Sequence, residues 1–114
     1  MQFGDEHYRD IPEMLLAHID QGKPRFDSVI WGNDRIAFMV YQTLLTQGIR
    51  IPQDIAVLGY DNLVGIGNLF LPPLSTVQLP HYEIGRLSTL HIINGDTHRD
   101  KVIVESPWLP RESI

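Results

Sequence analysis

Residues 26–62 read FDSVIWGNDRIAFMVYQTLLTQGIRIPQDIAVLGYDN, and this stretch predicts a strand, a helix and a second strand. Residues 26–32 are apolar and rich in β-branched side chains, and residues 55–60 form a second apolar run. Such near-continuous apolar strands are typical of parallel sheets that are buried on both faces. Between them, apolar residues recur at helical spacing at Ile36, Ala37, Val40, Leu44 and Leu45. We therefore expect two buried parallel strands joined by a right-handed helical crossover.

The flanking sequence extends this unit into an α/β protein. Residues 10–20 predict a helix in which Asp10 is the N-cap, Glu13 completes a capping box and Gly22 follows the last turn. After the second strand, residues 62–73 predict a long loop and residues 74–79 a third strand. Residues 80–94 then predict a helix, residues 101–105 a strand, and residues 108–114 an extended tail.

The composition is that of an ordinary globular domain, with 114 residues, 43% hydrophobic and 20% charged. No apolar run approaches the roughly 20 residues that a membrane span needs, and residues 1–6 lack the features of a secretory signal. The chain has no Cys, which excludes disulfides, zinc–thiolate sites and a Cys nucleophile and fits a reducing cytosol. Its net charge of -5 argues against direct DNA binding, because nucleic-acid-binding domains normally carry a basic face.

Polar side chains follow both predicted strands of the central unit. Asn33 and Asp34 come after the first strand, and Asp61 and Asn62 come after the second. Ligands of open parallel sheets bind beyond the carboxyl ends of the strands. There Asp61 can accept hydrogen bonds from vicinal hydroxyls, and Asn33 can donate and accept together. The alternative role for Asn33 or Asp34 is a helix cap, which the spacing alone favours, whereas for Asp61 a turn and a binding site are equally supported.

Other chemistry has little support in the sequence. The five histidines are scattered without a metal-ligand spacing, there is no G-x-S-x-G elbow, and the Gly65–Gly67 pair is not a phosphate loop. His91 lies on the apolar side of a predicted helix and is expected to be packed and hydrogen-bonded. Trp31 lies on a predicted buried strand and is expected in the core. We therefore expect no metal, no cofactor and no enzymatic activity.

Five segments resemble motifs of the lactose-repressor (LacI/GalR) family. Residues 26–37 resemble its "PDAVFCANDxxA", and residues 48–62 resemble its "GLRVPEDVSVVGYDD/N". Residues 72–77 are similar to "PPLTTV", residues 82–85 to "YEMG" and residues 111–113 to "RxST". Each motif is modest by itself, but they occur in the family's order and spacing over about residues 8–114, which makes the combination highly specific.

The resemblance implies the fold of a type I periplasmic-binding-protein-like sensor, which has two α/β lobes. Residues 1–78 would be part of the C-terminal effector-binding lobe. Residues 79–104 would be a crossover segment that normally packs on the N-terminal lobe, and residues 105–114 the returning C-terminal strand. The family's DNA-binding head has no counterpart in these 114 residues, so contact with DNA would need a part outside this chain.

The resemblance also implies a function, namely effector binding and dimerisation in a bacterial, cytoplasmic transcriptional repressor. Asp61 matches the family's effector-binding aspartate, and Asn33 matches an asparagine that lines the same cleft. The effector would be a sugar, a sugar acid or a nucleobase-like molecule. Leu79 stands where the family often has Gln, which suggests a less polar effector. The alternative is a sugar-binding periplasmic receptor of an ABC transporter.

The same resemblance predicts a homodimer interface on the C-terminal lobe. The matching positions include aromatic and Met residues, which are typical of interface cores. They are Phe38, Met39, Tyr41, Leu69 and Phe70. The alternative is that some of them are core residues, and for Phe38 the two roles are equally supported. Because one lobe is missing, we also expect the isolated chain to expose apolar surface and to self-associate.

Overall fold

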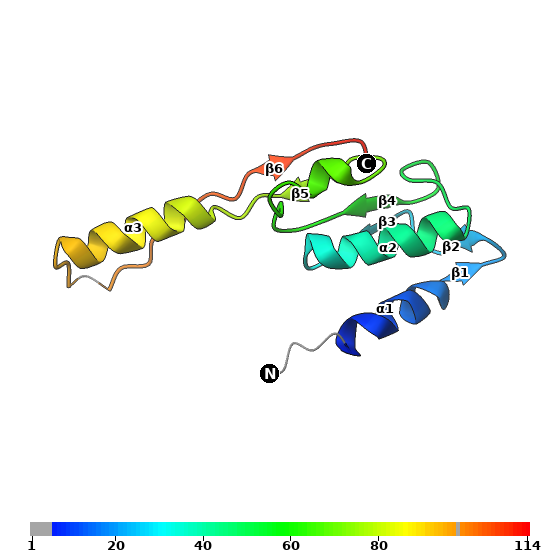
Figure 1. Ribbon diagram of the computed structural model, residues 1–114, viewed down its shortest axis with the longest axis horizontal. Helices are drawn as coiled ribbons and strands as arrows, with labels where there is room; N and C mark the ends of the chain where they lie inside the picture. The colour runs from blue at the N-terminus through cyan, green and yellow to red at the C-terminus, as the bar shows by residue number, and fades with distance from the viewer. Residues whose placement is uncertain (1–5, 98) are drawn as a thin grey trace.

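The computed structural model describes residues 6–97 and 99–114 as an elongated molecule with principal extents of 60 × 31 × 23 Å. Its elements are α1 (Glu6–Leu16), β1 (Ile19–Asp20), β2 (Lys23–Pro24), β3 (Ser28–Ile30), α2 (Asp34–Thr46), β4 (Ala56–Leu58), the 3-10 helix η1 (Gly67–Leu69), β5 (Thr76–Val77), α3 (His81–Ile93) and β6 (Trp108–Leu109). Figure 1 shows α3 and the segment after it extending away from the rest of the molecule. None of the described helices is long and apolar enough to cross a membrane.

The predicted strand–helix–strand unit is present. β3 and β4 pair in parallel with Val29 opposite Val57, and α2 connects them. On its other side β4 is linked in parallel to the β5 region by bridges from Leu58 to Ser75 and from Asp61 to Gln78. β6 then pairs antiparallel with β5. The order β3–β4–β5–β6, parallel over its first three strands, confirms the expected α/β class.

One hydrophobic core lies between the inner face of α2 and the strands. Tyr41 on α2 is central to this core: its ring packs edge-to-face on Phe70 at a centroid distance of 4.8 Å, and its hydroxyl donates to the carbonyl of Pro72 at 3.0 Å. Burial raises the pKa of Tyr41 to about 12. The buried apolar side chains are Leu15, Ala37, Val40, Tyr41, Leu44, Ile49, Ile51, Ile55, Val57, Phe70 and Leu74.

The C-terminal tail fastens β4 to β5 through one buried hydroxyl. Oγ of Ser113 donates to the carbonyl of Val57 at 2.6 Å and accepts the N–H of Ser75 at 2.7 Å. The Val57 N–H in turn donates to the carbonyl of Ser113 at 2.9 Å. Because each of these residues is fully buried, the tail completes the sheet instead of lying free on its surface.

Two predictions about the N-terminal segment were wrong. α1 begins at Glu6 and continues through Pro12, so Asp10 lies inside the helix and is not its N-cap. The helix ends at Leu16, and Gly22 lies in the two-residue turn of the β1–β2 hairpin, with φ 74° after a φ of 49° at Gln21. Two consecutive positive φ values suit a type I′ hairpin turn, which is why a glycine stands there.

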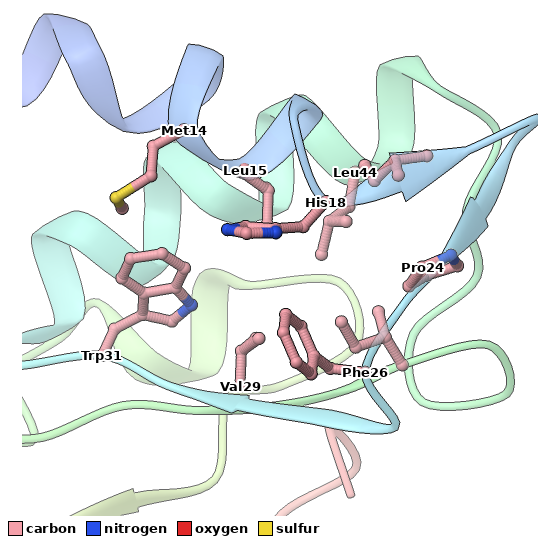
Figure 2. A pocket seen from close by; sticks show the side chains of 10 residues that line it. Met14, Leu15, His18, Pro24, Phe26, Val29, Trp31 and Leu44 are labelled. Carbon is pink, nitrogen blue, oxygen red and sulfur yellow. The ribbon is translucent and has the colours of Figure 1, made fainter.

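Two strand predictions were also wrong. β3 is not buried on both faces: Val29 faces the helices, but Ile30 points the other way and is 73% exposed. The physical reason is that α1 and α2 both lie on one side of β3, as Figure 2 shows. Residues 101–105 form no strand, because α3 and the following segment extend away from the sheet and leave them without a pairing partner. The returning strand is β6, within the predicted tail.

Candidate ligand-binding site

A polar hollow of about 220 Å³ lies at the carboxyl ends of β3 and β4. Its walls come from α1, from the start of α2 and from the loop after β4. The lining residues are Tyr8, Asn33, Asp34, Arg35, Asp61 and Leu63. The structure therefore brings together Asn33 and Asp61, the two residues that the sequence singled out. Tyr8 and Arg35 were not predicted, because their place in the hollow depends on how α1 packs against α2.

Asn33 is the N-cap of α2. Its backbone is extended, and its Oδ1 accepts the N–H of Ile36 at 2.9 Å, which satisfies one of the free donors at the helix start. The cap interpretation is thus confirmed. The cap uses only the oxygen of the amide, and the amide nitrogen makes no hydrogen bond to the residues that the structure describes. It remains available as a donor toward a ligand in the hollow.

Asp61 lies in the segment that follows β4, at an isolated bridge to Gln78, and its φ of 113° is an uncommon value for a residue other than glycine. Its N–H donates to the carbonyl of Val77 at 2.8 Å, and its carbonyl accepts the N–H of Leu79 at 3.3 Å. The carboxylate Oδ1 lies 2.9 Å from Nε2 of His81, the first residue of α3. The structure gives Asp61 a positive-φ backbone held by its bridge to Gln78 and places the residue on the wall of the hollow, and its role in binding stays a prediction.

Asp34 forms the floor of the hollow and is a structural residue. It is 1% exposed, its Oδ1 accepts the hydroxyl of Thr76 and its Oδ2 accepts the N–H of Leu63, both at 2.9 Å. A Cβ atom on Gly59 would overlap with the Asp34 carboxylate and lie 2.7 Å from Leu74. Asp34 therefore joins α2 to β5 and to the loop after β4, a role beyond the helix cap that the sequence predicted.

Arg111 holds the same loop from the opposite side. Its guanidinium donates to the carbonyl of Leu74 at 2.7 Å and to Oδ1 of Asn62 at 2.9 Å. It passes so close to Gly67 that a Cβ there would lie 2.5 Å from Nη1. The sequence marked Arg111 only as part of a closing motif. In the structure it contacts Asn62, the residue next to Asp61.

The predicted interface residues divide into two groups. Tyr41 and Phe70 are 2% and 4% exposed, so their side chains fill the core of this chain and are not free to contact a partner. Phe38 and Leu69 are 49% and 79% exposed, and Met39 is half-buried. Only these last three positions can contribute side chains to an interface.

A second, apolar pocket of about 110 Å³ lies between the helices and β3 (Figure 2). Met14, Phe26 and Val29 are among its walls, and Figure 2 shows the indole nitrogen of Trp31 on the side that faces the pocket. Trp31 is half-buried beside the core, and its indole N–H finds no acceptor among the described residues. Nearly all of the lining is apolar, so this pocket does not suit a sugar or another polyol.

His91 differs from its prediction. Its side chain is 48% exposed and lies 3.8 Å from the carboxylate of Asp96, because α3 has no buried residue at all. Residues 6–97 and 99–114 contain no group of three or more His, Asp or Glu side chains that could hold a metal ion.

Comparison with known proteins identifies the family of this chain. Residues 1–112 match the model of the family described as periplasmic binding proteins and sugar binding domain of LacI family. The chain belongs to this family. The resemblance seen in the sequence motifs is confirmed, and so is the periplasmic-binding-protein-like fold.

Three relatives of this family show how the chain compares. The sucrose operon repressor of Escherichia coli is 62% identical over 95 residues, which cover 83% of this chain and 29% of the repressor. The ribose operon repressor of Escherichia coli strain K12 is 39% identical over 103 residues, covering 88% and 30%. A LacI family regulator from Arthrobacter sp. FB24, solved in complex with lactose, superimposes with a TM-score of 0.74 at 26% identity, covering 93% and 39%. The chain thus spans less than a third of these curated repressors.

Proposed function

We propose that this chain is the effector-binding part of a bacterial LacI-type transcriptional regulator and that its effector is a sugar. The observation that carries the proposal is the shared hollow of Asp61 and Asn33 at the carboxyl ends of β3 and β4. The high identity to a sucrose operon repressor favours sucrose or a closely related sugar. The same relatives are named as repressors, which favours a regulator over a transport receptor or an enzyme.

The hollow offers hydrogen-bonding groups that suit neutral hydroxyls. The Asp61 carboxylate accepts from a sugar hydroxyl, the Asn33 amide donates to another, and the guanidinium of Arg35 adds a further donor. At about 220 Å³ the hollow is smaller than the sites that enclose whole small ligands, which typically measure roughly 300–1,000 Å³. A disaccharide would therefore need a second wall from a part of the regulator outside this chain.

We also propose the division of the chain that the family resemblance implies. Residues 1–78 supply the effector-binding lobe, residues 79–104 cross to the other lobe, and residues 105–114 return to complete the sheet. We further propose that the regulator is a cytoplasmic homodimer, with Phe38, Met39 and Leu69 at its interface, and that it binds DNA through a head outside this chain. The exposed apolar side chains of Phe38 and Leu69 support this interface.

A chimera tests the proposal directly. This chain replaces the matching C-terminal segment of the Escherichia coli sucrose operon repressor, and operator binding is measured by fluorescence anisotropy against sucrose, fructose, glucose, ribose and lactose. We expect one sugar to change operator affinity at least tenfold while the others act weakly. A chimera that binds its operator but responds to no sugar would contradict the proposal.

A further inference from the structure

We propose that His81 is a positioning residue for the effector site and fixes the carboxylate of Asp61 in its binding orientation. The inference rests on the proposed function of Asp61. Nε2 of His81 lies 2.9 Å from Oδ1 of Asp61, and because an ionised carboxylate only accepts hydrogen bonds, the imidazole is the donor. This contact commits one carboxylate oxygen and leaves the other for a sugar hydroxyl.

The backbone geometry makes this contact a built feature. Asp61 is held at both its N–H and its carbonyl, by Val77 and Leu79, and the N–H of His81 donates to the carbonyl of Leu79 at 2.9 Å. The bridge between Asp61 and Gln78 ties the same two segments together. The backbone of Asp61 is therefore bonded to the stretch that ends at His81, which brings the two side chains within reach of each other.

The place of His81 in the fold adds a second argument. It is the first residue of α3, a helix with no buried residue, so packing does not fix how that helix leaves the sheet. Within the described parts of the chain, the His81–Asp61 contact is the one side-chain hydrogen bond that joins α3 to the remaining elements. Backbone hydrogen bonds place the start of the crossover helix beside Asp61, and the His81–Asp61 bond adds the contact that orients the carboxylate.

The positioning role should have a measurable effect on sugar affinity. The Asp61 side chain is 29% exposed and would sample several rotamers without a partner. Holding it in one rotamer before the sugar arrives removes part of the ordering cost of binding. We therefore expect His81→Ala to weaken sugar binding about fivefold to tenfold, and His81→Gln, whose amide can still donate, to stay within about threefold.

The decisive experiment needs no ligand. Three-bond couplings between the α and β protons of Asp61 are measured by NMR on the 114-residue chain, with His91→Ala as the matched control on the same helix. We expect one dominant Asp61 rotamer in the unsubstituted chain, in His81→Gln and in His91→Ala, and averaged couplings in His81→Ala. Averaged couplings in the unsubstituted chain, or unchanged couplings in His81→Ala, would overturn the inference.

Sugar affinity in the chimera separates this inference from the proposed function. If Asp61→Ala abolishes the sugar response and His81→Ala leaves the affinity unchanged, the role of His81 is wrong and the site stands. If neither substitution changes the affinity, the site at Asp61 is wrong, and the inference falls with it. Weakening by His81→Ala that His81→Gln restores supports both.

Discussion

At the scale of single residues, the floor of the hollow depends on the absence of a side chain at Gly59. A Cβ there would overlap with the carboxylate of Asp34, which is buried and already bonded to Thr76 and Leu63. The three nearest atoms belong to the side chains of Asp34, Leu74 and Thr76, which are all buried and therefore have little room to move. Position 59, directly after β4, must therefore be glycine because the buried Asp34 side chain fills the space that a Cβ would need.

Gly59→Ala is therefore expected to lower the free energy of unfolding by about 1–3 kcal/mol, the usual cost of overpacking a tight site. Urea denaturation followed by circular dichroism measures this. Gly85→Ala is the matched control, because its added Cβ would meet nothing within 4 Å beyond its neighbours and the backbone of its own helix, and alanine favours a helix interior by roughly 1 kcal/mol. Equal stability of the two variants would contradict the packing argument.

A second residue-scale prediction concerns the turn before β4. The guanidinium of Arg50 and its backbone N–H both donate to Asp54, and they lower the pKa of this carboxyl from 3.8 to about 2. Because the folded pKa lies below the unfolded one, the pair contributes stability that is fully present above about pH 4 and is lost as the pH falls through about 2. Carboxyl carbon NMR should give a midpoint near 2 for Asp54 and a return toward 3.8 in Arg50→Gln. A midpoint near 3.8 without the substitution would contradict this contact.

Asn33 and Asp61 could be selected from the sequence because each is placed by its immediate neighbours along the chain. Asn33 caps the helix that starts beside it, and Asp61 follows its own strand, so pattern and spacing were enough to select both. Asp34 and Arg111 were not assigned their roles because their partners are distant in sequence: Thr76 is 42 residues from Asp34 and Asn62 is 49 residues from Arg111. Such contacts exist only once the chain has folded.

At the scale of elements, the C-terminal tail is the least predictable part of the sheet. Residues 111–113 have no apolar alternation, and β6 is only two residues long. The buried hydroxyl of Ser113 nevertheless bonds to both β4 and the start of β5. The tail thus adds side-chain hydrogen bonds to its backbone ones, and a hydrophobic pattern indicates neither kind.

Ser113→Ala should consequently lower the free energy of unfolding by about 2–4 kcal/mol, since it leaves the buried N–H of Ser75 without its acceptor and removes a donor from the carbonyl of Val57. Chemical denaturation gives the value. Glu112→Ala serves as the control, because that neighbouring side chain is exposed and its loss should cost less than about 0.5 kcal/mol. A loss below 1 kcal/mol for Ser113→Ala would show that the tail does not fasten the sheet.

At the scale of the whole molecule, the chain carries apolar surface that nothing in it covers. On α3, Ile92 and Ile93 are 77% and 71% exposed, and Ile103 in the following segment is 81% exposed. The apolar pattern predicted this helix correctly. The prediction that His91 is packed was wrong, because no described residue provides a surface that buries α3.

Self-association of the isolated chain is the expected consequence. Sedimentation velocity should show dimers or larger species whose share rises with protein concentration. Replacing Ile92 and Ile103 together by Lys should remove the association that runs through α3 and leave no species larger than the dimer proposed through Phe38, Met39 and Leu69. A Lys at the already polar position Gln53 should leave the association unchanged. A compact monomer at high concentration would contradict the account of α3 as an unpartnered helix.

The proposed function requires Asp61 to bind a sugar at the carboxyl ends of β3 and β4. The most direct measurement is calorimetric titration of the chimeric repressor and its Asp61→Ala variant with the sugar that the anisotropy screen selects. Asp61→Ala should reduce the sugar affinity at least a hundredfold while the melting temperature falls by less than a few degrees, because the side chain lies at the rim of the hollow and outside the core. Unchanged sugar affinity in a folded Asp61→Ala variant would contradict the claim.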